Sequence, residues 1–165
     1  MCTTFIPLLL RSKGTIVNHG TQADRAPVPW NSAYSASKAA LHAYSRTLRL
    51  ELAPLGVSVV YLRTGKVQTH ILPGKPVLKP GSLYESVRNN FEERVVSLAN
   101  GGISAELAAK RMADGILAKQ AWSIAVGGGA KIAEVIGWLD NFLPFDVWGF
   151  VMRKEFKLDQ IKEAA

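Results

Sequence analysis

The chain has 165 residues, which is enough for one ordinary domain and too short for two. Its composition, 48% hydrophobic and 20% charged, is that of a packed globular protein and excludes collagen, a coiled coil and a disordered chain as descriptions of the whole. The 20 Lys and Arg residues outnumber the 13 Asp and Glu residues, and the net charge of +7 favours anionic partners such as phosphorylated cofactors, acidic membrane surfaces or nucleic acid.

Several classes of protein and site are not expected from this sequence. The single cysteine, Cys2, excludes an internal disulfide and suits a reducing compartment. The histidines His19, His42 and His70 are scattered, so no structural zinc site is expected. The apolar stretch 5–10 is too short for a signal peptide, and no run approaches the ~20 apolar residues of a membrane-spanning helix. Because the positive residues are spread along the chain, nucleic-acid binding is not expected.

The first half of the chain predicts a strand–helix–strand unit. Residues 2–12 are typical of the end of a helix, and residues 15–18 of a short buried strand. A long helix is expected over 33–53, with Ser32 as its N-cap. The almost wholly apolar run 57–62 predicts a parallel strand covered on both faces. The unit formed by these elements should be right-handed.

The second half predicts a proline- and glycine-rich loop over 73–81, followed by helices over 83–99 and 104–119. A short strand over 122–126, a further helix over 130–139 and an aromatic tail from 141 onward complete the chain. The glycines 127–129 follow the strand, and we interpret them as its end rather than as a phosphate-binding loop, because an isolated glycine cluster is weak evidence. Leu83, Tyr84 and Phe91 either line an apolar pocket or pack the first helix onto the body, and packing is favoured.

Tyr34 and Lys38 are the residues most suited to chemistry. They are four positions apart in the predicted helix, so they share one face. A nearby ammonium group favours the phenolate over the phenol, which would make Tyr34 a general acid near neutral pH. The alternative interpretation is that Tyr34 and Lys38 are ordinary helix residues without a catalytic role. The small residues of 32–41 leave room beside the pair for a ligand or another helix.

These features together resemble the short-chain dehydrogenase/reductase family over the C-terminal two-thirds of its domain. The resemblance is carried by strand 15–18, by Thr21 placed thirteen positions before Tyr34, by Tyr-Ser-Ala-Ser-Lys at 34–38, and by the stretch 50–60. It implies a Rossmann-like three-layer α/β sandwich with a parallel sheet, truncated at the N-terminal nucleotide-binding half. The stretches 29–34, 40–45 and 64–69, the glycines 127–129 and the aromatic tail look most like the fungal 1-acyldihydroxyacetone-phosphate reductase branch.

The resemblance also implies a role for each matching residue. Tyr34 would donate a proton to the substrate carbonyl, Lys38 would bind the nicotinamide ribose and assist Tyr34, and Thr21 would orient the carbonyl oxygen where the family usually has serine. Besides Tyr34 and Lys38, the cofactor would be contacted by Gly65, Val67 and Thr69. Thr64 stands where this last motif usually has proline.

The implied function is NADP(H)-dependent reduction of a ketone to a secondary alcohol. The resemblance to the fungal branch suggests a lipid-like substrate such as acyl-dihydroxyacetone phosphate, and it alone favours NADP, so NAD stays open. The family's glycine-rich turn, ribose selector and Asn-Ala-Gly motif do not occur in the chain. The alternative is therefore a catalytically inactive fragment or an interaction module that lacks the dinucleotide-binding half.

The expected organisation is a single partial domain over 1–165, with a catalytic half at 1–70, a substrate loop and lid at 70–103, and a C-terminal region at 104–165. An uncovered sheet edge would make it marginally stable. The aromatic segment 138–154 suggests contact with a membrane surface, with a pocket cover or a dimer contact as alternatives. The expected location is the cytoplasm, with peripheral attachment to endoplasmic reticulum or lipid droplets as a further alternative, and a homo-oligomer is a candidate assembly.

Overall fold

The computed structural model describes residues 2–26, 28–69, 71, 77–118, 121–139, 142–143 and 146–161. Expectations that concern His70, Pro73, Gly74, Pro76 and Phe145 lie outside these residues. Among the described helices, none combines the length and the apolar character needed to cross a bilayer.

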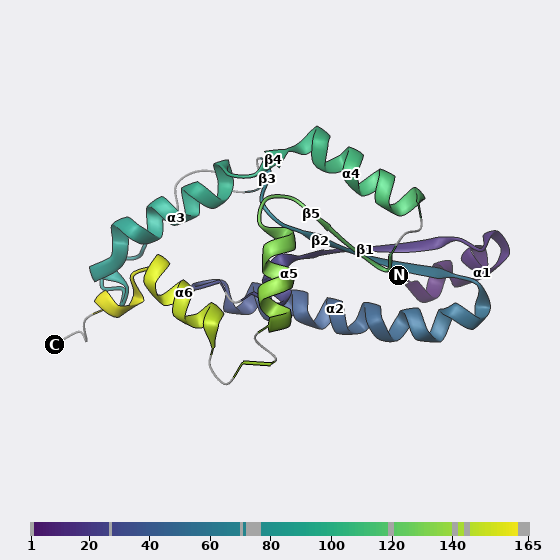
Figure 1. Cartoon of the computed structure of the whole chain (residues 1–165), viewed down its shortest axis with the longest axis horizontal. Coiled ribbons are helices and arrows are strands. Elements are labelled where there is room, and N and C mark those ends of the chain that lie inside the picture. The colour runs from purple at the N-terminus through teal and green to yellow at the C-terminus, as the bar shows by residue number, and fades with distance from the viewer. Residues whose placement is uncertain are drawn as a thin grey trace.

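A three-stranded parallel sheet in the order β1–β2–β5 forms the centre of the molecule (Figure 1). Its strands are β1 (Thr15–Thr21), β2 (Ser58–Thr64) and β5 (Ser123–Val126). β1 runs three residues beyond the predicted strand, because its pairing with β2 continues to the partners Thr21 and Thr64. The carboxyl ends of the strands therefore meet at one edge of the sheet, where open α/β folds bind ligands.

Helices cover both faces of this sheet (Figure 1). On one face lie α1 (Cys2–Ser12) and α2 (Ser32–Leu52), and α4 (Ala105–Leu117) packs on the other, where Gly115 approaches Ile124 of β5. The result is the three-layer α/β arrangement that the sequence predicted. The buried core under α1 and α2 consists of Leu48, Leu52, Val57 and Val59, with Ile6, Leu9, Leu10 and Ile16 packed around it.

The remaining elements extend from the carboxyl edge of the sheet. A short parallel pair, β3 (Val67–Gln68) with β4 (Ile103–Ser104), was not predicted, because two-residue strands carry no periodic pattern. The helix expected over 83–99 is a 3₁₀ turn followed by α3 (Arg88–Asn100). Two helices, α5 (Ala130–Leu139) and α6 (Val147–Glu155), follow β5 in the chain. The described 3₁₀ turns are η1 (Gln22–Asp24), η2 (Ala53–Leu55), η3 (Glu85–Val87) and η4 (Leu158–Gln160).

Two local details of the first half were decided by packing. Ser32 is the first residue of α2 and not its N-cap: Asn31 holds that position and makes no capping bond with its side chain. Gly20 lies under the buried ring of Tyr61, and a Cβ atom at Gly20 would stand 1.9 Å from Tyr61 Cζ. The tyrosine therefore requires glycine at this point of the neighbouring strand.

β1 is the outermost strand on one side of the sheet. Within the described part of the chain it pairs with β2 alone, and its Val17 side chain is 40% exposed. An unpaired strand edge with apolar side chains is prone to association. The expectation of marginal stability remains a prediction.

Candidate functional site

Tyr34 and Lys38 lie in the first turns of α2, and Lys38 contacts β1 near its carboxyl end. The Lys38 Nζ atom is 5.9 Å from the centre of the Tyr34 ring. The same ammonium donates a hydrogen bond of 3.0 Å to the main-chain carbonyl of His19, which fixes the helix against the strand. The Tyr34 side chain is half-exposed, so its phenol is accessible to a ligand. The pair therefore forms a fixed cation beside an accessible phenol.

Thr21 ends β1 at the same edge of the sheet. It is buried, and its hydroxyl donates to the carbonyl of Thr64 at 3.2 Å while accepting from the main-chain N–H of Ala23 at 3.4 Å. The hydroxyl is thus committed within the protein. Its proton would have to leave Thr64 before it could be donated to a carbonyl substrate.

His19 reaches the same edge, although sequence reasoning gave it no role. Its Nε2 atom is 2.6 Å from the hydroxyl oxygen of Thr64. Burial lowers the pKa of His19, and the positive charge of Lys38 lowers it further. The signal that could have found this contact is the parallel pairing of β1 with β2, which places residues of both strands on one face of the sheet.

Gly65, Val67 and Thr69 follow β2 away from this edge. A Cβ atom at Gly65 would stand 2.4 Å from the carbonyl oxygen of Gly128, so Gly65 is packed against the glycines 127–129. This close approach gives those glycines a structural role at the end of β5, where Gly65 N–H donates to the Val126 carbonyl at 2.7 Å. Val67 lies in β3, and Thr69 is exposed just beyond it.

A buried ionic network lies behind the site, between α2, β2 and α5. The guanidinium of Arg63 is 1% exposed and binds both carboxylate oxygens of the fully buried Asp24 at 3.1 Å. Its Nη1 atom also donates to Ser123 Oγ at 3.2 Å and to Glu134 Oε1 at 2.9 Å. The Nη2 atom of Arg63 also lies 3.2 Å from Nε2 of His42, which is a residue of α2. One buried cation thus connects the segment after Thr21 to three other elements.

His42 is held neutral in this network. Arg63 can only donate, so Nε2 of His42 accepts and the proton lies on Nδ1, 4.0 Å from an Asp24 carboxylate oxygen. Burial lowers the pKa of His42 below its ordinary value of 6.5; the carboxylate of Asp24 opposes this change, and the nearby Arg63, Arg25 and Arg46 reinforce it. The ring also stacks on Trp122, with centroids 5.6 Å apart.

The lowered pKa of His42 predicts that acid destabilises the fold. As the pH falls below 6.5 towards the folded-state pKa, the unfolded chain takes up a proton that the folded chain does not, so the free energy of unfolding falls. Urea titrations at about pH 7.5 and about pH 5.5 should show this loss, and the loss should be smaller in His42→Gln. An equal loss in wild type and variant would contradict the assignment.

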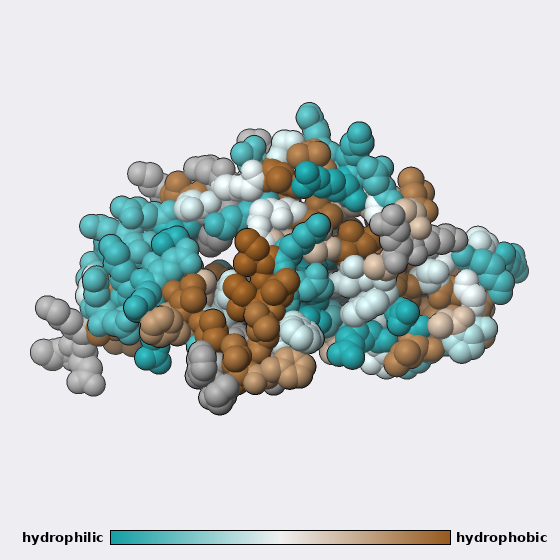
Figure 2. All heavy atoms as spheres, viewed as in Figure 1, coloured by the Kyte–Doolittle hydropathy of each residue, from teal (hydrophilic) through white to brown (hydrophobic). Residues whose placement is uncertain are grey.

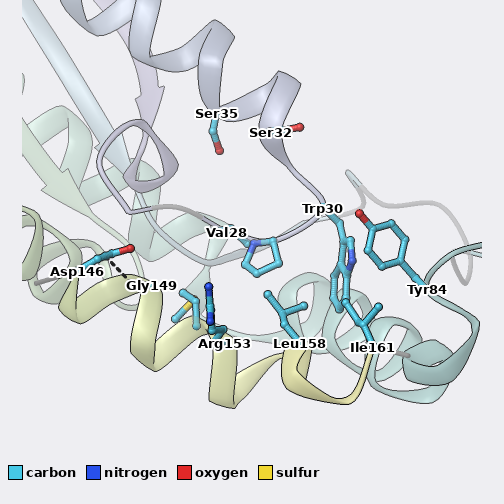
Figure 3. A pocket seen from close by; sticks show the side chains of 12 residues that line it. Val28, Trp30, Ser32, Ser35, Tyr84, Asp146, Gly149, Arg153, Leu158 and Ile161 are labelled. Atoms are coloured by element: carbon cyan, nitrogen blue, oxygen red, sulfur yellow. Dashed lines mark hydrogen bonds between the residues drawn. The ribbon is translucent and has the colours of Figure 1, made fainter. Parts of the chain in front are cut away.

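A cavity of about 500 Å³ lies on the other side of the start of α2, next to Tyr34 in sequence but not lined by it (Figure 3). Its walls are mainly apolar, with the cation Arg153 among them. Trp30 forms one wall and makes edge contacts with Tyr84, Phe91 and Phe156, at centroid distances of 5.0–6.1 Å. The full lining is Val28, Pro29, Trp30, Ser32, Ser35, Tyr84, Asp146, Gly149, Met152, Arg153, Leu158 and Ile161.

Two of the residues that line this cavity carry a buried polar side-chain atom. Ser35 Oγ and Trp30 Nε1 are buried, and neither has a hydrogen-bond partner within the described part of the chain. Figure 3 shows the Ser35 side chain directed from α2 towards the cavity. Buried polar atoms without partners are costly, so they favour a bound group that can satisfy them.

Leu83, Tyr84 and Phe91 were expected either to line an apolar pocket or to pack a helix onto the body. In the structure Tyr84 lines the cavity, Phe91 packs on Trp30 and Leu83 is exposed.

Comparison with known proteins supports the resemblance read from the sequence. Residues 1–76 match the family model described as short chain dehydrogenase. The short-chain dehydrogenase virD of Hypocrea virens is 34% identical over 97% of this chain, and this chain covers 55% of that protein. The NADPH-dependent 1-acyldihydroxyacetone phosphate reductase of Saccharomyces cerevisiae is also 34% identical, over 99% of this chain and 55% of its own length.

Solved structures show the same fold. A short-chain dehydrogenase from Streptomyces avermitilis superposes with a TM-score of 0.63 at 23% identity, covering 96% of this chain and 56% of that one. A short chain dehydrogenase from Burkholderia cenocepacia, solved in complex with NADP, gives 0.61 at 24% identity, covering 88% and 54%. The chain therefore spans about half the length of the proteins it matches. Within that span, the chain is similar to members of the short-chain dehydrogenase family.

Proposed function

We propose that this chain carries the proton-donating part of an NADP(H)-dependent oxidoreductase that reduces a ketone of a lipid-like substrate to a secondary alcohol. The observation that carries the proposal is the Tyr34–Lys38 pair, held against β1 by the Lys38 hydrogen bond to the His19 carbonyl. A phenol beside a fixed ammonium group can give up a proton because the phenolate left behind is stabilised.

The residues at this edge fit the nicotinamide end of a dinucleotide. Lys38 has three donor hydrogens and uses one on His19, which leaves donors for the hydroxyls of a ribose. When bound, the cofactor supplies the hydride. Tyr34 would hold the proton for the carbonyl oxygen, Lys38 would hold the ribose, and Thr21 would orient the carbonyl once its hydroxyl turns from Thr64. The main chain near Gly65 and Val67, with the exposed Thr69, would border the nicotinamide.

The choice of NADP rests on relatives. The similar yeast reductase is described as NADPH-dependent, and the Burkholderia cenocepacia structure contains NADP. The positive net charge of this chain suits a cofactor with an additional phosphate, though it suits any polyanion. We therefore expect NADPH to bind more tightly than NADH.

The cavity beside α2 supports an amphipathic substrate. Apolar walls from Val28, Trp30 and Leu158 suit an acyl chain, and the guanidinium of Arg153 suits an anionic end such as a phosphate. The partnerless atoms Ser35 Oγ and Trp30 Nε1 would hydrogen-bond an ester oxygen, which leaves the ketone oxygen to Tyr34 and Thr21. Acyl-dihydroxyacetone phosphate has all three features and is the substrate class we propose.

NADPH titration of the 165-residue chain tests the proposal directly. We expect a saturable enhancement of nicotinamide fluorescence, weaker than in full-length relatives, because the chain spans about half of their length. Lys38→Met should weaken this binding, since it removes the ribose donor. A linear fluorescence response without saturation would mean that the chain is not a working reductase.

That negative result would favour the second candidate, a non-catalytic interaction module. The observation behind it is the edge strand β1, seven residues long, whose only partner among the described strands is β2. Such an edge can pair with a strand from another chain. In that case, chromatography of the cofactor-free chain should show a defined complex instead of a monomer.

A further inference from the structure

α5 turns its small side chains inward and its large apolar side chains outward. Ala130 and Ala133 are 1% and 3% exposed. Gly137 faces the body too, because a Cβ atom there would stand 3.1 Å from Arg25 Cβ. On the opposite side Ile132 and Trp138 are 64% and 56% exposed. A surface helix normally buries its large apolar residues, so this reversed arrangement indicates that something covers the outer face.

The exposed apolar surface continues beyond the helix. Trp138 and Phe142 are in contact, with ring centroids 4.7 Å apart, and α6 adds the exposed Phe150. Figure 2 shows hydrophobic surface gathered over α5 and continuing below it. We call this surface the α5 patch; its members are Ile132, Val135, Trp138, Leu139, Phe142 and Phe150. Contiguous apolar surface of this kind marks an interaction site.

Cations border the α5 patch. Lys131 at the start of α5 is exposed, and so is Lys154 in the last turn of α6. Lys154 Nζ lies 4.5 Å from the centre of the Phe150 ring, so one charge sits directly on an aromatic member of the patch. The acidic side chains of the two helices are paired with cations, although they are 41% and 38% exposed: Glu134 binds Arg63 and Glu155 binds Arg94.

We propose that the α5 patch binds the surface of a membrane that contains anionic lipids, with α5 lying in the plane of the interface. Apolar and aromatic side chains would enter the headgroup region while the bordering lysines meet lipid phosphates. Charge complementarity favours this partner over a second copy, because a copy carries the same cations and the same net charge of +7. The inference does not depend on the reductase activity.

Sedimentation of the 165-residue chain with sucrose-loaded vesicles tests the proposal. Vesicles of phosphatidylcholine with about 30% phosphatidylserine should bind at least about tenfold more protein than pure phosphatidylcholine vesicles. Raising the salt from about 0.1 M to about 0.5 M should weaken binding several-fold. Trp138→Ser with Phe142→Ser should lower the partition coefficient by about tenfold or more. Leu117→Ser, at a 79% exposed apolar position on α4, is the matched control and should not change it.

A second readout does not depend on substitutions that weaken binding. Brominated lipids in the same vesicles should quench part of the tryptophan fluorescence, and Trp138→Phe should remove most of that quenching while vesicle binding stays within about twofold. The proposal is overturned if both vesicle types bind equally and the patch variants bind as wild type does. It is also overturned if no vesicle binds and sedimentation velocity shows a dimer that Trp138→Ser dissociates, since the occupant is then a second copy.

Discussion

Tyr34→Phe is expected to lower ketone turnover by at least about a hundredfold while the dissociation constant for NADPH changes by no more than a few-fold. The substitution removes one oxygen from a half-exposed ring and leaves the Lys38 hydrogen bond to His19 in place. Without the phenol, the carbonyl oxygen must take its proton from water. NADPH oxidation followed by absorbance and NADPH binding followed by fluorescence separate the two effects.

A matched control comes from the same helix. Tyr44→Phe makes the identical chemical change at a tyrosine of similar exposure, 47% against 48%, and should leave turnover near the wild-type value. Undiminished turnover in Tyr34→Phe would remove Tyr34 from the mechanism. Equal losses in the two variants would show instead that the change acts through the stability of the helix.

The second large effect is expected from the buried ionic network. Asp24→Asn should lower the free energy of unfolding by about 3–5 kcal/mol, because it leaves the Arg63 guanidinium buried without its bidentate carboxylate. Glu134 cannot replace that partner, since it is 41% exposed and approaches a single nitrogen. Urea denaturation followed by circular dichroism measures the loss, provided that the variant folds at all.

The double variant Asp24→Leu with Arg63→Met distinguishes an unpaired charge from lost packing. Replacing a buried ion pair with apolar side chains of similar size is often neutral, so most of the loss should be recovered. Glu85→Gln breaks the exposed ion pair with Arg88 and should leave the unfolding midpoint unchanged within error. If Asp24→Asn is as mild as Glu85→Gln, the network contributes nothing to stability.

The network also explains why stability and site geometry are connected in this chain. Asp24 lies three residues after Thr21, His42 lies one turn of α2 after Lys38, and both contact Arg63. Loosening Arg63 should therefore disturb the segment after β1 and the helix that carries Tyr34 and Lys38 together. Burial raises the pKa of the Tyr61 phenol, and the Asp24 carboxylate raises it further, while the Arg63 guanidinium opposes both; the phenol is therefore a further group that must remain uncharged.

Local features of the sequence were sufficient for the fold class and for the Tyr34–Lys38 pair. The patterns of apolar residues that mark strands and helices extend over only a few neighbouring residues. A strand such as 58–64 or a helix such as 32–52 can therefore be predicted to within a few residues. A pair one turn apart in a helix shares a face whatever the helix packs against. Strand, helix and strand in succession predict one parallel unit, and the three-layer arrangement was implied by the resemblance to the short-chain dehydrogenase/reductase family.

Contacts between distant residues could not be predicted in the same way. Arg63 directly follows the predicted strand 57–62, and nothing near it in sequence indicates that Asp24, 39 positions earlier, would neutralise it. The cavity joins Val28 to Ile161 across most of the chain. The strands β3 and β4 are too short for any pattern.

The sequence by itself determined the three central strands, most of the helices and the phenol–ammonium pair, because each depends on residues close together in the sequence. Only the tertiary structure decided which face of α5 is turned outward, how the Thr21 hydroxyl is engaged and where the buried Arg63 finds its counter-charges. The physical reason is that these features depend on burial and on contacts between elements, and both are fixed only when the helices and strands pack together.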